Sequence, residues 1–189
     1  MTPTEAEFVQ FAEAGSARLR RTAFLLCGDW HTAEDLTQAT LAKVFVAWRR
    51  ISRRDAVNAY AMRTLLNTYL AESRKKRPGE VLMGQLPEQR VEAPAPELRM
   101  AVLEALAMLP PKARAVVVLR YWEDQSIEQT AALLGCTTGN VKSQSARALD
   151  KLRLLLDAAT AEPTAGYPTG HPSGTREGDH GRDIASRTS

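Results

Sequence analysis

The sequence predicts an all-α protein made of two small helical domains, a flexible linker between them and a disordered C-terminal tail. Apolar residues recur at helical spacing in each patterned segment, and hardly any stretch alternates as a strand would. The period is lost over residues 78–97, where four prolines and two glycines indicate a linker. Residues 158–189 are rich in Gly, Pro, Thr and Ser, a composition typical of disorder. The expected domains are therefore residues 1–77 and 98–157.

The first two helices are predicted from capping residues and glycines. Thr4 and Glu7 form a capping box for the first helix, and Gly15 with Ser16 is expected to end it. A second helix then ends at Gly28, because glycine readily takes the positive φ that follows a helix.

A third helix is expected over residues 32–50, with a cap at Thr32 and with Asp35 three residues later. Its apolar stripe is wide, so it must be packed on both flanks and lie at the centre of the first domain. The loop 51–57 follows, and a fourth helix is expected over residues 58–76. The basic run that ends this helix can complement the helix dipole or contact phosphate, and the pattern leaves both open.

The second domain begins with two helices separated by prolines. A helix over residues 98–109 is predicted to end at Pro110, and Pro111 suits the first turn of the next helix. That helix continues over residues 112–124 and supplies, with the one before it, the core on which the following motif rests.

The following motif is a predicted helix-turn-helix. Ser126 and Gln129 form a capping box at the start of a short helix. Gly135 ends that helix, and either Thr137 or Thr138 caps the second one. Two helices joined by so short a turn place the second helix in the major groove of duplex DNA.

The exposed side of this second helix carries hydrogen-bond donors and acceptors and no large hydrophobe. Its residues are Thr138, Lys142, Ser143, Gln144 and Arg147. These are side chains that read base edges or bind phosphate. The alternative is an ordinary αα-hairpin with a solvated face.

The charge distribution favours a polyanionic partner. The chain has 189 residues and a formal net charge of +3. Residues 1–77 carry a net charge of +5, residues 78–97 carry −3, and residues 98–157 carry +2. Two basic blocks separated by an acidic stretch indicate two surfaces for one polyanion. Small basic excesses are also common on solvated helices, so the distribution supports DNA binding without deciding it.

Several functional classes are excluded. No apolar run approaches the roughly 18–20 residues of a membrane span, and the N-terminus has no signal-peptide pattern, so a cytoplasmic location is expected. Cys27 and Cys136 are the only cysteines and are expected to be reduced. Cys27 and His31 lack a second pair of ligands, so no metal site is expected. Phosphate-binding, dinucleotide and nucleophile motifs are missing, which predicts a protein that is not an enzyme and needs no cofactor.

Two segments resemble a known family. LRRTAFLLCGDWHTAEDLTQATLAKVFVAW is similar to region 2 of RNA polymerase sigma factors, and LEALAMLPPKARAVVVLRYWEDQSIEQTAALLGCTTGNVKSQSARALDKLR is similar to region 4. The resemblance is to the extracytoplasmic-function (ECF) class of the sigma-70 family, in its actinobacterial sigma-E-like group, and covers roughly residues 5–157. Its most specific parts are the Leu109-Pro110-Pro111 break, the VLRYWED stretch and the LGCTTGNVKS turn.

The resemblance implies a subunit that binds core RNA polymerase, through its clamp helices and flap, and directs it to the −35 and −10 elements of promoter DNA. Asp35 and Gln38 would contact the polymerase, although the pattern alone explains them by solvation and dipole compensation. An anti-sigma protein is a further candidate partner.

The resemblance also implies residues for the two promoter elements. Those for the −35 element are Thr137, Thr138, Lys142, Ser143, Gln144 and Arg147. Those for the melted −10 element are Arg53, Arg54, Asn58, Arg63 and Asn67. Gln144 departs from the arginine often found there, and Ser145 replaces a usual aliphatic residue, so the promoter sequence does not follow from the family pattern.

Two other functional classes remain as alternatives. The first is a conventional regulator whose helix-turn-helix binds an operator while residues 1–77 sense a signal or dimerise. The second is a helical adaptor that binds only protein, with every basic patch solvated. The basic and strongly patterned first domain favours the sigma factor over a regulator with a sensing domain.

Overall fold

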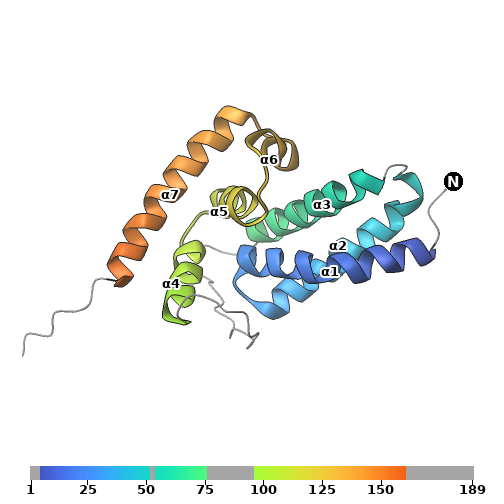
Figure 1. Cartoon of the computed structure of the whole chain (residues 1–189), viewed down its shortest axis with the longest axis horizontal. Helices are drawn as coiled ribbons and strands as arrows, with labels where there is room; N and C mark the ends of the chain where they lie inside the picture. Colours follow the sequence, from blue (N-terminus) through green and yellow to red (C-terminus); the bar gives the residue numbers. More distant parts are fainter. Residues whose placement is uncertain (1–4, 52–53, 76–95, 161–189) are drawn as a thin grey trace, which may run out of the picture.

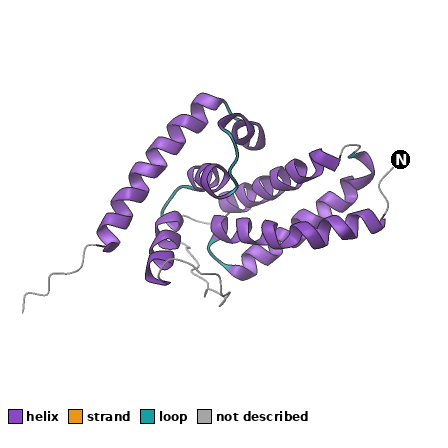
Figure 2. Ribbon diagram, in the orientation of Figure 1, coloured by secondary structure: helices purple, strands orange, loops and turns teal. Residues whose placement is uncertain are grey.

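The computed structural model describes residues 5–51, 54–75 and 96–160, and within these ranges every regular element is helical (Figures 1 and 2). The predicted all-α fold class is confirmed. The elements in chain order are α1 (Glu5–Cys27), α2 (Trp30–Ala47), η1 (Trp48–Arg50), α3 (Arg54–Lys75), α4 (Pro96–Ala107), α5 (Pro111–Val117), the π-helical turn η2 (Val118–Trp122), α6 (Ile127–Leu134) and α7 (Thr138–Thr160). The predicted cap at Thr4 and most of the predicted linker and tail lie outside the described residues.

Helices α1, α2 and α3 pack against one another as a three-helix bundle (Figure 1). Leucines from all three helices are fully buried between them, namely Leu26, Leu36, Leu65 and Leu66. Burying each such side chain contributes about 1.5–3 kcal/mol to folding. The buried hydroxyls of Thr37 and Thr40 donate to carbonyls one turn back in α2, so these two polar groups of the core are satisfied.

The two predicted N-terminal helices are one continuous helix, so the break predicted at Gly15 and Ser16 is wrong. The cause is tertiary packing of the first half of α1. The Phe8 ring lies 4.9 Å from that of Phe45 and 5.3 Å from that of Trp48, measured between centroids. These contacts hold the helix in place against the cost of one internal glycine, which is about 1 kcal/mol.

Two other helix starts also differ from the prediction. α2 begins at Trp30 and not after Thr32, because the Asp29 side chain accepts a hydrogen bond from the Thr32 backbone N–H at 2.7 Å and forms the cap. α3 begins at Arg54, four residues before the predicted start, which shortens the predicted loop 51–57. Val57, in this added turn, is buried in the core of the three-helix bundle, and that packing favours the earlier start.

Helices α4 to α7 form the second half of the described chain. Pro111 occupies the first turn of α5, as predicted. The predicted helix 112–124 divides into α5 and η2 and ends at Trp122, two residues before Asp124, which has a positive φ of 49°. Two small apolar clusters hold these helices together, one between α4, α5 and α7 and the other between α5, α6 and α7, and Val116 and Val141 are fully buried in the second. α7 continues to Thr160, beyond residue 157, the predicted end of the second domain.

The two halves pack against each other. Ala115, Leu119 and Leu133 from the second half share one buried cluster with the core of the three-helix bundle. Arg114 adds a polar contact, because its guanidinium donates to the Leu26 carbonyl at 2.6 Å. Figure 1 accordingly shows α5 and α6 lying beside the bundle, with α7 running along the outside.

Candidate nucleic-acid interface

The helix-turn-helix predicted from the sequence is present as α6 and α7. The Ser126 hydroxyl accepts from the Gln129 backbone N–H at 3.1 Å, and the Ser126 N–H donates to the Gln129 side chain at 2.7 Å. Gly135 follows α6 with a left-handed φ of 62°. The Thr137 hydroxyl accepts from the Asn140 N–H at 3.2 Å, which assigns the cap of α7 to the first of the two candidate threonines.

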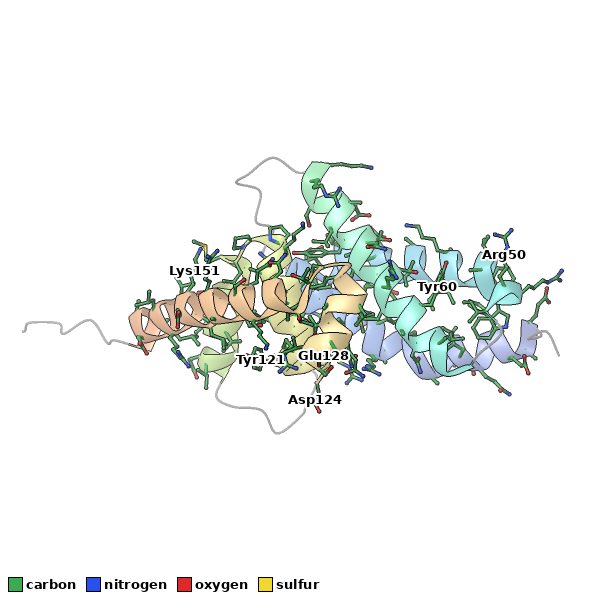
Figure 3. All side chains as sticks on the ribbon, turned by 90° about the horizontal axis from the view of Figure 1, so that it is seen from above. Arg50, Tyr60, Tyr121, Asp124, Glu128 and Lys151 are labelled. Carbon is green, nitrogen blue, oxygen red and sulfur yellow. The ribbon has the colours of Figure 1, made fainter. Side chains whose placement is uncertain are left out.

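The first turn of α6 also stabilises a negative charge. A hydrogen bond from its own backbone N–H lowers the pKa of Glu128, and the Ser126 hydroxyl, 2.9 Å away, acts in the same direction. Glu128 is fully exposed and lies near Asp124 on the outside of the molecule (Figure 3).

One side of α7 is buried and the opposite side is open. Val141 and Ala148 pack inward with at most 2% of their surface exposed. The exposed residues include five of the six predicted for the −35 element, namely Thr137, Thr138, Lys142, Ser143 and Arg147. Ser143 and Arg147 are four residues apart, so they lie one above the other on the open side of the helix.

Gln144 lies at the edge of this open side and is half-buried. Its amide donates to the Asn140 side chain at 2.7 Å, and the Ser143 hydroxyl donates to the Asn140 carbonyl at 3.1 Å. Asn140 was missed by the sequence reasoning, although its i, i+3 and i, i+4 spacing to Ser143 and Gln144 could have revealed it. It fixes Gln144 in place on the surface that faces away from the core.

Two glycine substitutions at this motif are expected to have opposite effects on stability. Gly135→Ala should lower the free energy of unfolding by about 1 kcal/mol or more, because alanine is strained at positive φ. Gly139→Ala should leave it unchanged or raise it by up to about 1 kcal/mol, since this glycine lies inside α7 with open space around it. Urea unfolding of both variants checks the pair, and equal effects would contradict the assigned turn geometry.

The residues predicted for the −10 element divide between two sides of α3. Arg63 and Asn67 are exposed on one stripe, with Tyr60 one turn earlier, and Tyr60 points outward from α3 in Figure 3. Asn58 is exposed too, but it lies roughly 140° around the helix from Arg63, at 100° per residue. Tyr60, which is 39% exposed, was missed by the sequence reasoning. A solvent-facing aromatic ring next to cationic residues is the usual arrangement for stacking on an unpaired base.

Arg53 lies outside the described residues, and of Arg54 the structure describes only the backbone, at the start of α3.

The two residues predicted for polymerase contact are exposed on α2. Asp35 and Gln38 lie on its outward side, and the same stripe continues with Ala42 and Val46 at i+7 and i+11. Val46 has 80% of its surface exposed, which is unusual for a valine in a helix so close to the core. The stripe therefore combines polar and apolar side chains, as protein–protein contacts do.

The described residues include no group of three or more His, Cys, Asp or Glu side chains that could hold a metal ion. Cys27 and Cys136 are half-buried, and neither is in a disulfide. None of the helices in the described ranges is long and apolar enough to cross a membrane.

Comparison with known proteins identifies similar sequences. Residues 11–78 match the family described as Sigma-70 region 2, and residues 99–152 match the family described as Sigma-70, region 4. The chain is 37% identical over 161 residues to the RNA polymerase sigma-E factor of Streptomyces antibioticus, covering 84% of this chain and 89% of that protein. It is 38% identical over 161 residues to the RNA polymerase sigma-E factor of Streptomyces coelicolor, covering 84% and 91%.

Solved structures are similar to the same part of the chain. The sigma factor RpoE of Bartonella quintana, solved in complex with the anti-sigma factor NepR, superimposes with a TM-score of 0.67 at 26% identity, covering 80% of this chain and 97% of that one. CnrH, solved in complex with the cytosolic domain of CnrY, shares the fold with a TM-score of 0.61 at 23% identity, covering 82% and 90%.

Proposed function

Because the chain belongs to the ECF class of the sigma-70 family of RNA polymerase sigma factors, we propose that it binds core RNA polymerase, recognises the −35 and −10 promoter elements and promotes DNA melting for initiation. The observation that carries this proposal is the presence of regions 2 and 4, in that order, with the region 4 helix-turn-helix exposing a polar side.

The two halves suit two forms of DNA. Region 4 meets intact duplex, where a helix in the major groove can read base edges. Region 2 must hold a melted strand, which calls for cationic side chains and surfaces on which bases stack. Unstacking costs a few kcal/mol per base, so binding the opened strand offsets that cost.

The residue assignments follow this division. In α7 and at its cap Thr137, the −35 contacts are assigned to the six residues predicted from the sequence, and Asn140 is added as the residue that positions Gln144. In region 2, the −10 contacts are assigned to Arg53, Arg54, Asn58, Arg63 and Asn67, with Tyr60 added for stacking. Polymerase contact is assigned to Asp35 and Gln38, with Val46 added on the same stripe.

Two domains, residues 1–77 and 98–157, and a linker over residues 78–97 remain our proposal for how the chain is divided. The chain acts by binding, so we infer no catalytic step of its own. Since it works on promoter DNA and polymerase, we place it in the bacterial cytoplasm.

An anti-sigma protein is a further partner in this proposal. RpoE, the 26% identical relative, was solved with one. In this chain an apolar groove of about 490 Å3 lies between α1, α4, η2 and α7. Its lining includes the exposed side chains of Leu98, Val102 and Trp122, with Arg21 and Arg99 also in the lining. An amphipathic helix with acidic flanks would complement this combination of apolar surface and positive charge.

One binding experiment separates the three functional classes. The binding of the purified chain to a promoter duplex is measured in the absence and in the presence of core polymerase. A sigma factor binds promoter DNA tightly only with core polymerase. Equal binding without polymerase would support a conventional regulator, and binding under neither condition would support an adaptor that binds only protein.

Substituting Gln144 is expected to change promoter preference. Glutamine pairs with the N6 and N7 edge of adenine, whereas arginine pairs with the O6 and N7 edge of guanine. Gln144→Arg should therefore shift preference at one −35 base pair toward guanine by roughly tenfold or more, since a bidentate contact is worth about 1–3 kcal/mol. The measurement is holoenzyme binding to a library of −35 sequences.

Arg147→Ala is the comparison for that experiment. A lost phosphate contact weakens all sequences alike and reduces the salt dependence of binding. If Gln144→Arg also changes affinity evenly across the library, Gln144 does not read a base, and specificity must come from its neighbours or from DNA shape.

A further inference from the structure

A buried carboxylate joins the two halves of the chain. Glu123, just after η2, accepts a hydrogen bond from Nε of Arg18 at 2.7 Å, and Nη2 of Arg18 lies 2.5 Å from the same oxygen. Its other oxygen accepts from the hydroxyl of Thr22. Arg18 and Thr22 are both in α1, so this contact spans more than 100 positions of sequence.

The side chains of Glu123, Arg18 and Thr22 differ in how unfavourable it is for each to lose this contact. The Glu123 side chain is only 2% exposed, and a buried carboxylate without partners is strongly unfavourable. The Arg18 side chain is 56% exposed and can be solvated when it is free. The Thr22 hydroxyl also lies 3.0 Å from the Arg18 carbonyl, one turn back, where it can donate in the absence of Glu123. The contact can therefore open without leaving an unsatisfied group in α1.

Beside this contact, apolar side chains of the two halves pack along a seam, which reaches the part of region 2 proposed to bind DNA. Leu133 of α6 shares the buried cluster of the three-helix bundle. A cavity of about 220 Å3 lies along the seam, and its lining includes Asn58 and Met62 of α3 together with Gln125 and Leu133 from the second half. Asn58, a proposed −10 residue, thus faces the second half of the chain.

This packed arrangement cannot engage a whole promoter. The −35 and −10 elements are named for positions about 25 base pairs apart, which is roughly 85 Å of duplex at 3.4 Å per base pair. In the structure α6, the first helix of the motif for −35, packs directly against α3, the helix for −10. Both surfaces can reach their elements only after the halves separate.

The side of α2 that is proposed to contact polymerase takes no part in the packing between the two halves. α2 packs on α1 and α3, while Asp35 and Gln38 remain exposed. Polymerase can therefore dock on the closed chain before the halves separate.

From these contacts we propose that Arg18, Thr22 and Glu123 form a latch that holds the free chain closed and that must open before both promoter elements are bound. The proposal rests on the proposed function for its role at promoters, but the closed state itself can be measured without DNA or polymerase. The latch makes premature promoter binding by the free chain unfavourable.

The test is energy transfer between dyes at Ala71 in α3 and Ala158 in α7, both exposed, in the full chain. The dyes are attached through non-natural amino acids, so that Cys27 and Cys136 stay unchanged. Glu123→Ala should raise the ratio of open to closed chains by about tenfold or more, as expected for loss of hydrogen bonds to a charged group. Arg18→Ala should act in the same direction.

Matched controls make the result specific. Arg20→Ala removes the same charge from the same helix, but the contacts it breaks are with α2, namely an exposed ion pair with Glu34 and the contact of the guanidinium with the Trp30 ring. Its ratio of open to closed chains should therefore equal that of the unchanged chain. In the double variant Arg18→Ala with Glu123→Ala, the change in the open-to-closed ratio should be smaller than the two single changes combined, because both substitutions remove the same interaction.

Two readouts separate the latch from the proposed function. If Arg18→Ala and Glu123→Ala are folded by circular dichroism and transfer energy like the unchanged chain, the latch is wrong. Faster formation of promoter complexes by holoenzyme carrying either variant would support its role. A complete lack of promoter-directed transcription with the unchanged chain would instead overturn the proposed function, whatever the dyes report.

Discussion

Replacing Asp35 and Gln38 together by alanine is expected to weaken the complex with core polymerase by roughly tenfold to a hundredfold, the effect of truncating central interface contacts. Both side chains are exposed on α2 and neither is needed by the core, so the fold should be unaffected. The measurement is binding of the labelled chain to core polymerase, together with the helical circular-dichroism signal of the variant.

Glu34→Ala is the matched control for this double variant. Glu34 is also exposed on α2, one turn before Gln38, but its carboxylate pairs with Arg20 of α1. Because that carboxylate is already engaged within the chain, its removal should weaken polymerase binding much less than the double variant does. If the double variant binds as tightly as the unchanged chain, this side of α2 is not the polymerase contact.

Replacing Arg114 by methionine is expected to lower the free energy of unfolding by about 2–4 kcal/mol. The guanidinium donates to the carbonyl of Leu26 near the end of α1, at 2.6 Å. It also donates to the carbonyl of Ala107, the last residue of α4, at 2.5 Å and to that of Leu109, just after α4, at 3.2 Å. Carbonyls at helix C-termini have no partner within the helix, and a cation there also complements the dipole. Each unsatisfied buried group costs about 1–3 kcal/mol.

Lys112→Met is the control, because Lys112 is exposed two positions earlier in the same helix. It removes the same charge and should change the stability by less than about 0.5 kcal/mol. Urea unfolding of the two variants checks the prediction. Equal stability of both would show that water replaces the guanidinium at these carbonyls without cost.

The motifs with local chemistry were predictable from the sequence. The capping box at Ser126 and Gln129 and the left-handed Gly135 each depend on a few adjacent residues, and the structure confirms both. Pro111 in the first turn of α5 is a third example. Such features are predictable because a hydrogen bond or a φ angle within one turn decides them.

Features decided by distant contacts were not predictable. Gly15 looked like a helix end, but aromatic rings from α2 hold the helix together across it. The π-helical turn η2 and the contact between Glu123 and α1 join parts of the chain about 100 residues apart. No local pattern contains that information.

The candidate site was predictable by residue type more than by arrangement. The stripe of Ser143 and Arg147 on α7 follows from helical spacing alone. The support that Asn140 gives Gln144 was detectable from i, i+4 spacing. The position of Asn58 beside Gln125 and Leu133 was not, because it depends on how the two halves of the chain pack. The roles of all these residues in DNA contact stay predictions.

Transcription with mapped start sites is the most direct test of the sigma-factor assignment. Core polymerase is incubated with a library of genomic fragments, with and without the chain, and the 5′ ends of the transcripts are sequenced. We expect new start sites that appear only with the chain, each preceded by one shared pair of sequence elements near −35 and −10. Transcripts with the same start sites in both reactions, despite a folded chain, would contradict the assignment.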